Sequence, residues 1–161
     1  MSDRDRSARA LTPAETALAA SVFGDAIDYA PVRLTRHKWA FFQPRDTVMA
    51  PCGCIHFHPK GELWCDDFAH APLDQQGLFI HEMVHVWQHQ RGICLPLVRH
   101  PWCRYDYALR PGLTLKRYGI EQQGEIVRHA FLLRNGAKVP GAPPLAQYET
   151  LLPFRPPSPS S

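Results

Sequence analysis

The sequence predicts one α+β domain, in which a small, mainly antiparallel sheet packs on a central helix. A capped helix near the start, a group of short β-prone runs and two long helical segments indicate this class. The chain has 161 residues, 45% of them hydrophobic, which is enough for one core. We expect the domain to cover residues 11–136, between a flexible N-terminal tail (1–10) and a Pro-rich C-terminal tail (137–161) that is extended or disordered.

The first helix has start and stop signals in the sequence. Thr12 can cap a helix, Pro13 suits the first helical position, and Glu15 follows the cap by three residues. Gly24 can end the helix. These signals predict a helix over roughly Pro13 to Phe23.

Short β-prone runs broken by proline and glycine follow the first helix. The run around residues 54–58 alternates polar and apolar side chains, as a half-buried strand does. We expect these runs to form the small sheet. They are Val32–Leu34, Lys38–Phe42, Thr47–Met49, Ile55–His58 and Glu62–Cys65.

Two longer segments have helical patterns. The segment from Asp74 to Arg91 is apolar on nearly every side, with Asp74 as a possible cap and Gly92 as a stop, so its helix should be central. A third helix is expected from Leu115 to Arg134, closed by Asn135-Gly136.

Composition excludes several classes of protein. The formal charge of +3 comes from 18 basic and 15 acidic residues without a Lys/Arg stripe, which argues against nucleic-acid binding. No apolar run approaches the length of about 18 residues that spans a membrane, and the charged start is not a signal peptide. Five cysteines at irregular spacing fit a reducing compartment. We expect a cytoplasmic protein, with signal-independent export left open.

The segment His81-Glu82-Met83-Val84-His85 carries the chemistry. A spacing of four places both histidines on one helical face, close enough to hold one Zn²⁺ per chain. Glu82 is rotated by about 100° from His81, so it can reach a zinc-bound water and act as general base. Because that water can attack a carbonyl, we expect a zinc metallohydrolase with a peptide or protein as substrate.

A catalytic zinc needs a third protein ligand. Glu121, Glu125 and His129 form one polar stripe on the expected third helix. One of them should bind zinc while its neighbour accepts a hydrogen bond from a ligand histidine. We favour Glu121 as ligand with Glu125 supporting it. The reverse, with Glu125 binding and His129 supporting, stays open.

Two stretches resemble a known family. HEMVHVWQHQR at residues 81–91 and YGIEQQGEIVRHAF at residues 118–131 are similar to small bacterial proteins labelled Vgr-related, which have a minimal gluzincin-like (HExxH zinc metallopeptidase) domain. The resemblance implies a zincin-like fold with an active-site helix, a second ligand-bearing helix and the ligand set His, His, Glu. Glu121-Gln122-Gln123-Gly124-Glu125 is similar to the Glu-x-x-Ala-Asp pattern of one gluzincin branch, with Gly for Ala and Glu for Asp. That match implies Glu121 as ligand and Glu125 as helper.

The resemblance also bears on substrate and partners. Zincin architecture implies an edge strand, here residues 54–58, that binds extended substrate by β-augmentation. Tyr105, Tyr107 and Tyr118 are candidates for the hydrogen bond to the oxyanion that gluzincins obtain from His or Tyr. The family's label implies a link to type VI secretion spike proteins.

Other functions remain as alternatives. The chain could be a non-catalytic zinc-binding adaptor or interaction module of a secretion system, although a structural zinc has no use for Glu82. A nucleic-acid-associated protease of the SprT-like kind would need a third histidine and a basic attachment, and neither is clear. A second metal site is a weaker alternative because its residues lack the spacing of a zinc ribbon. These residues are Cys52, Cys54, His56, His58 and Cys65.

Overall fold

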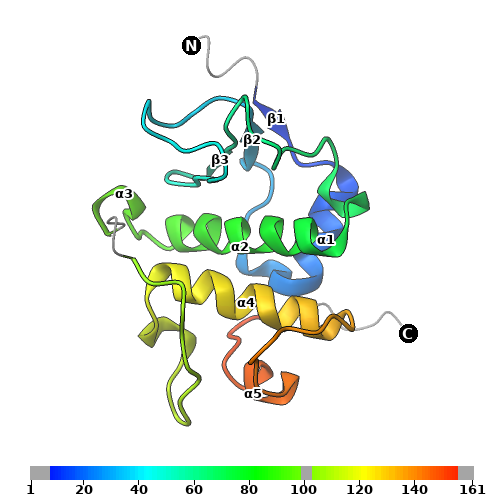
Figure 1. The fold of residues 1–161 in the computed structure, drawn as a ribbon, viewed down its shortest axis with the longest axis vertical. Helices are drawn as coiled ribbons and strands as arrows, with labels where there is room; N and C mark the ends of the chain where they lie inside the picture. The colour runs from blue at the N-terminus through cyan, green and yellow to red at the C-terminus, as the bar shows by residue number, and fades with distance from the viewer. Residues whose placement is uncertain (1–7, 99–102, 156–161) are drawn as a thin grey trace.

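Two long helices, α2 (Leu73–Gln90) and α4 (Ile120–Arg134), lie side by side across the middle of the structure (Figure 1). The computed structural model describes residues 8–98 and 103–155. The sheet lies on one side of α2, and a short helix lies on the far side of α4, so that the class is α+β (Figure 1). The other elements are β1 (Arg9–Ala10), α1 (Pro13–Phe23), η1 (Gly24–Ala26), β2 (Arg33–Thr35), β3 (Cys54–His56), η2 (Phe68–His70), α3 (Leu95–Val98), η3 (Leu115–Arg117) and α5 (Leu145–Glu149).

Helix α1 confirms the prediction from its caps, and its Glu15 has a second role. Thr12 and Glu15 form the capping box at the start of the helix. The fully buried Glu15 carboxylate also accepts two hydrogen bonds of 2.8 Å from the Arg9 guanidinium and one of 2.9 Å from the N–H of Phe68. Glu15 therefore joins β1, α1 and η2.

The sheet has three strands in the order β1-β2-β3. Strand β1 pairs with β2 antiparallel, whereas β2 pairs with β3 parallel, with Leu34 opposite Ile55. The expectation of a mainly antiparallel sheet was therefore wrong. Among the described residues, Thr47–Met49 contributes one isolated antiparallel bridge, from Met49 to His56.

Two other expected strands are turns and loops. Residues 38–42 and 62–65 contain no strand. The buried Gln43 side chain provides the reason for the first. Its amide accepts from the N–H of Trp39 and donates to the C=O of Thr47, so backbone groups that a strand would pair are satisfied by a side chain.

The two long helices were predicted with small errors at their starts. Pro72, and not Asp74, occupies the N-cap position of α2, and Asp74 lies in the first turn. The expected third helix is divided, because Gly119 is extended and forms the N-cap of α4. The Gly119 N–H donates to the side chain of Gln122 over 2.9 Å, which begins the helix there.

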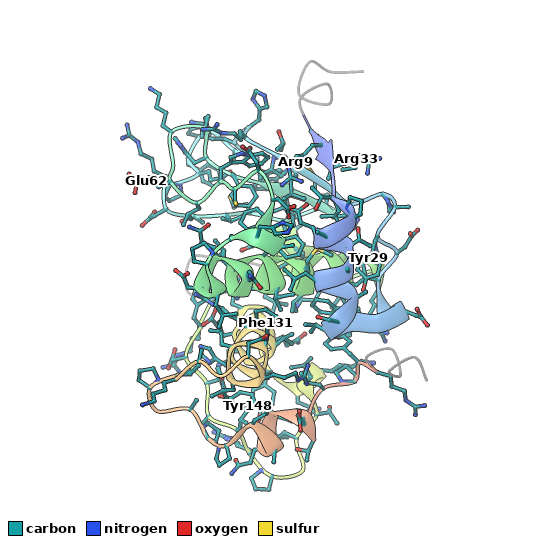
Figure 2. The ribbon with its side chains drawn as sticks, turned by 90° about the vertical axis from the view of Figure 1, so that its right-hand side faces the viewer. Arg9, Tyr29, Arg33, Glu62, Phe131 and Tyr148 are labelled. Atoms are coloured by element: carbon teal, nitrogen blue, oxygen red, sulfur yellow. The ribbon has the colours of Figure 1, made fainter. Side chains whose placement is uncertain are left out.

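Neither tail is as predicted where the structure describes it. Residues 9–10 form β1, while residues 1–7 and 156–161 lie outside the described residues. The C-terminal segment folds back: Tyr148 of α5 is fully buried, and Phe154 packs edge-on against Phe23 and Trp87 with ring centroids 4.8 and 5.1 Å apart. Figure 2 shows Tyr148 between α5 and the end-on α4. Burial of these aromatic side chains stabilises the packed segment, although its prolines favour an extended or disordered chain.

No helix among the described residues is both long and apolar enough to cross a membrane.

Replacing Glu15 tests the buried junction. Glu15→Ala leaves the Arg9 guanidinium and the Phe68 N–H without their acceptor, so we expect a loss of about 3–5 kcal/mol in the free energy of unfolding. Urea unfolding measures this, with Glu62→Ala at an exposed position as the matched control, expected to change stability by less than about 0.5 kcal/mol. Similar stabilities of the two variants would contradict the role of Glu15.

Candidate metal centre

Three side chains from two helices converge between α2 and α4. His81 and His85 lie one turn apart on α2, and Glu121 lies in the first turn of the antiparallel α4. The Nε2 atoms of both histidines are 3.1 Å from the same Oε2 of Glu121. All three are buried, and their potential ligand atoms lie within 4.8 Å of one another. We call this set the His-His-Glu cluster.

The cluster has the dimensions of a metal site. Two ligand atoms of a tetrahedral zinc ion are separated by about 3.4 Å, given metal–ligand bonds of about 2.0–2.1 Å. The Nε2–Oε2 distances of 3.1 Å are close to that value. Imidazole nitrogen and carboxylate oxygen are also the donor types that zinc binds. The residues present therefore fit one such ion.

Two glutamines set the orientation of His85. Gln88 donates its amide N–H groups to the C=O of Ile120 and to Oε1 of Gln123, and Gln123 donates to the C=O of Tyr118. A backbone carbonyl can only accept, so both amide orientations are determined. Oε1 of Gln88 must then accept the Nδ1 proton of His85 over 2.8 Å. The neutral ring consequently presents the Nε2 lone pair to the cluster.

Glu125 does the same for His81. Its Oε1 accepts from Nδ1 of His81 over 2.8 Å, and its other oxygen is 3.3 Å from Nε2 of His129. The structure thus places Glu121 in the cluster, Glu125 behind His81, and His129 on the far side of Glu125. These positions agree with the favoured one of the two alternatives, and the choice of Glu121 over Glu125 as metal ligand stays a prediction.

Electrostatics at the cluster favour a cation. Burial alone would lower the pKa of His81, but hydrogen bonds to Glu121 and Glu125 raise it to about 9. Burial alone would raise the pKa of Glu125, yet hydrogen bonds from His129 and His81 hold that pKa well below its usual range. Without a metal, a proton on His81 supplies this positive charge at neutral pH. A metal ion would take the place of that proton.

Glu82 is buried beside the cluster, and its charge contributes to the raised pKa of His81. Its Oε2 is buried and has no hydrogen-bond partner among the described residues. A carboxylate oxygen in this state is costly in a protein interior and is typical of a group that acts on a bound molecule. Glu82 therefore has an acceptor available next to the two histidines.

One tyrosine of the three candidates lies over the cluster. The ring of Tyr105 stacks on that of His81 at 6.3 Å between centroids, and the residue is 47% exposed. The Tyr107 hydroxyl instead bonds to His129 and Tyr148 at 2.6 and 2.7 Å. The Tyr118 hydroxyl accepts the N–H of Arg110.

A cavity of about 350 Å³ opens beside the cluster. His85 and Glu121 form part of its wall, and the remaining wall is apolar. Strand β3, expected to bind substrate along its edge, is covered there at His56, whose backbone pairs with Met49 over 2.7 and 3.1 Å. The cavity therefore offers an opening beside His85 that is separate from the edge of β3.

In the described part of the chain, the residues weighed as a second metal site do not form a group of three close enough to share an ion. Within residues 8–98 and 103–155, the His-His-Glu cluster is the one group of three potential ligands close enough to share an ion.

Comparison with known proteins agrees with part of the sequence-based resemblance. No family model matches the chain. The chain is 48% identical over 135 residues to the type VI secretion system spike protein VgrG2b of Pseudomonas aeruginosa PAO1, covering 79% of this chain and 13% of the spike protein. The solved effector domain of Pseudomonas aeruginosa VgrG2b superimposes with a TM-score of 0.73 at 46% identity, covering 80% of this chain and 75% of that one. The chain belongs to the family of the VgrG2b effector domain.

The Vgr-related part of the resemblance is thereby confirmed, and the gluzincin part stays a prediction. Because the chain spans only 13% of the spike protein, it matches a small part of VgrG2b. The match to the solved effector domain of VgrG2b covers 75% of that chain.

Sequence reasoning missed three residues that support the cluster in this VgrG2b-family domain. Gln88 follows His85 by three positions, a spacing that could have indicated the contact, whereas Gln123 needed the facing helix to be known. Gly124 is the third. A Cβ there would lie 2.6–2.8 Å from ring atoms of His81, so only glycine lets α4 approach that ring.

Substitution of Gly124 tests this close approach. Alanine is favoured over glycine in a helix by about 1 kcal/mol, yet Gly124→Ala must displace the His81 ring, and we expect a net loss of about 1–3 kcal/mol. Gly77→Ala on α2 is the matched control, because its Cβ would meet the flexible end of Leu132 at 3.1 Å. Urea unfolding and the NMR signal of the His81 Nδ1 proton are the measurements. An unchanged signal in Gly124→Ala would show that the contact is unimportant.

Proposed function

We propose that this domain is a zinc-dependent metallohydrolase of the zincin type, acting as a peptidase. One zinc per chain would be held by His81, His85 and Glu121. The observation that carries the proposal is the convergence of two Nε2 lone pairs and a carboxylate oxygen in a buried space. Both Nδ1 protons are already committed to Glu125 and Gln88, as in metal-binding histidines.

The catalytic residue in this proposal is Glu82. Zinc, when bound, would polarise a water molecule and a carbonyl oxygen and bring the pKa of the water to about 7. Glu82 would accept a proton from the water that attacks the peptide carbonyl and would pass it to the departing nitrogen as the C–N bond breaks. Its buried Oε2 without a partner is available for the first of these transfers.

Tyr105 supports the same reaction. Of the three candidate tyrosines it is the one that lies over His81, with nearly half of its surface open to solvent. From this position over the cluster, Tyr105 could donate to the negative charge that develops on the attacked carbonyl oxygen. We therefore favour Tyr105 over Tyr107 and Tyr118 as the donor to that oxygen.

The relatives give the setting. They are a type VI secretion spike protein and its effector domain. We infer that this domain is likewise an effector that associates with spike proteins and acts on a peptide or protein substrate. Such association would also give the chain a route of export that needs no N-terminal signal.

The alternative is a zinc-binding adaptor without catalysis, which the match to part of a spike protein favours. That role would leave the buried carboxylate of Glu82 without a purpose, at a cost in stability. The two experiments that follow separate the alternatives.

Zinc content tests the ligands. Wild type should bind one zinc per chain, and His81→Ala and Glu121→Ala should lose it. Glu125→Ala should keep the site but bind zinc about 10–100-fold more weakly, because it only orients His81. His70→Ala, at an exposed position, is the control. Elemental mass spectrometry and titration against a chelator measure these effects, and no zinc in reconstituted wild type would disprove the site.

Glu82→Gln tests the mechanism. The variant keeps all three ligands and so should retain one zinc, while cleavage should fall by about 10²–10⁴-fold because the proton acceptor is gone. Cleavage of an unfolded protein by the zinc-loaded variants is followed by mass spectrometry, with Glu62→Gln as the matched control. Glu82→Gln with the activity of wild type would rule out this role. A zinc-loaded wild type that cleaves nothing would favour the adaptor.

A further inference from the structure

The geometry points to the cavity beside His85 as a specificity pocket that takes a large apolar side chain of the substrate peptide. This inference rests on the proposed function and names its substrate class: peptides with an aromatic or long aliphatic residue next to the bond that is cleaved. The cavity is the feature of the site that neither the His-His-Glu cluster nor Glu82 accounts for.

The walls of the cavity carry two kinds of residue. Trp39, Met49 and Leu95 are among the apolar side chains that line it, and the polar ones are His85 and Glu121. Both polar residues belong to the cluster. An occupant of the cavity therefore lies beside two of the three residues that are proposed to hold zinc, as a side chain adjacent to the reacting carbonyl would.

The size of the cavity fits a side chain. At about 350 Å³ it is near the lower end of the range of ligand pockets. This volume suits one aromatic or aliphatic group more than an extended stretch of polypeptide. The rest of a peptide would lie outside the cavity, along its mouth.

The pocket is held in shape by Gln43. The buried side chain of Gln43 bonds to the backbone of Trp39, of Thr47 and of His56, at 2.8–2.9 Å. Met49 is fixed by its bridge to His56. The loop that provides one wall is thus tied to β3 before any ligand arrives. A preformed pocket loses less conformational entropy on binding than one that must be ordered.

Phe42 places an aromatic ring at this pocket although the residue is 62% exposed. Its neighbour Phe41 is 87% exposed and packs edge-on against it, with centroids 5.3 Å apart, but does not line the cavity. Covering the large apolar side chains that are exposed to water lowers the free energy of the complex. An apolar side chain entering beside Phe42 provides that cover.

The lining also excludes charged side chains. An Asp or Lys side chain would lose its hydration among Trp39, Met49 and Ile120 and find no dedicated ion-pair partner, because Glu121 is engaged by the two histidines. Glycine would leave the pocket unfilled. We expect Phe, Leu and Met to be preferred over Asp, Lys and Gly.

Equilibrium binding tests the pocket separately from catalysis. Zinc-loaded Glu82→Gln, in which cleavage is blocked, is titrated into fluorescein-labelled capped heptapeptides of Ala and Gly that carry one variable residue: Phe, Leu, Asp, Lys or Gly. Fluorescence anisotropy should show the Phe and Leu peptides binding about tenfold or more tightly than the other three. Adding Phe42→Ala should weaken the Phe peptide about three- to tenfold and leave the Gly peptide unchanged. Adding Phe41→Ala, the matched control, should change neither.

Each outcome decides one of the two ideas. Equal affinities across the series, or equal effects of Phe41→Ala and Phe42→Ala, would overturn the pocket even if wild type cleaves the peptides. Tighter binding of the Phe and Leu peptides, with the expected effect of Phe42→Ala, would support the pocket even if zinc-loaded wild type cleaves none of the peptides. That result would contradict only the proposal of a hydrolase. A flat series together with a dimer that Phe42→Ala dissociates would overturn the pocket in favour of a contact between two copies of the chain.

Discussion

A carboxylate oxygen and two imidazole nitrogens face one another at hydrogen-bonding distance in the buried space between α2 and α4. Lone pairs gathered in this way repel one another unless a cation lies among them, and the low polarity of the surroundings strengthens that demand. The raised pKa of His81 has the same cause, because a proton on its ring also supplies positive charge beside the carboxylates. Gly124 lets α2 and α4 approach closely enough to bring these atoms together, since any side chain there would occupy the space of the His81 ring.

The groups behind the cluster keep it in one arrangement. On one side, Gln88 and Gln123 connect His85 to backbone carbonyls at the start of α4. On the other, Glu125 connects His81 to His129, and hydrogen bonds continue to Tyr107 and to Tyr148 of α5. The C-terminal segment is therefore joined to the candidate metal centre through side chains. Such connections hold the histidines in a single tautomer and limit their motion.

The groups proposed for catalysis and the pocket proposed for selectivity lie in different parts of the fold. The proposed zinc ligands and the proposed proton acceptor Glu82 lie on the two long helices, whose regular geometry places them accurately. The pocket proposed for selectivity is formed largely by the loop between β2 and β3 and by α3. Helices α2 and α4 contribute only His85, Ile120 and Glu121 to its lining. Within the family of the VgrG2b effector domain, changes in that loop could alter the preferred peptide while the His-His-Glu cluster stays the same.

The sequence by itself determined the features that depend on local periodicity. Four residues make about one helical turn, so His81 and His85 had to share a face, and the capping box of Thr12 and Glu15 placed α1 correctly. Packing between distant segments decided the rest. The stripe of Glu121, Glu125 and His129 meets α2 in only one register, and that register puts Glu121 in the cluster. The parallel pairing of β3, the burial of Tyr148 and the pocket beside His85 likewise come from contacts between residues far apart in the chain, which no local pattern encodes.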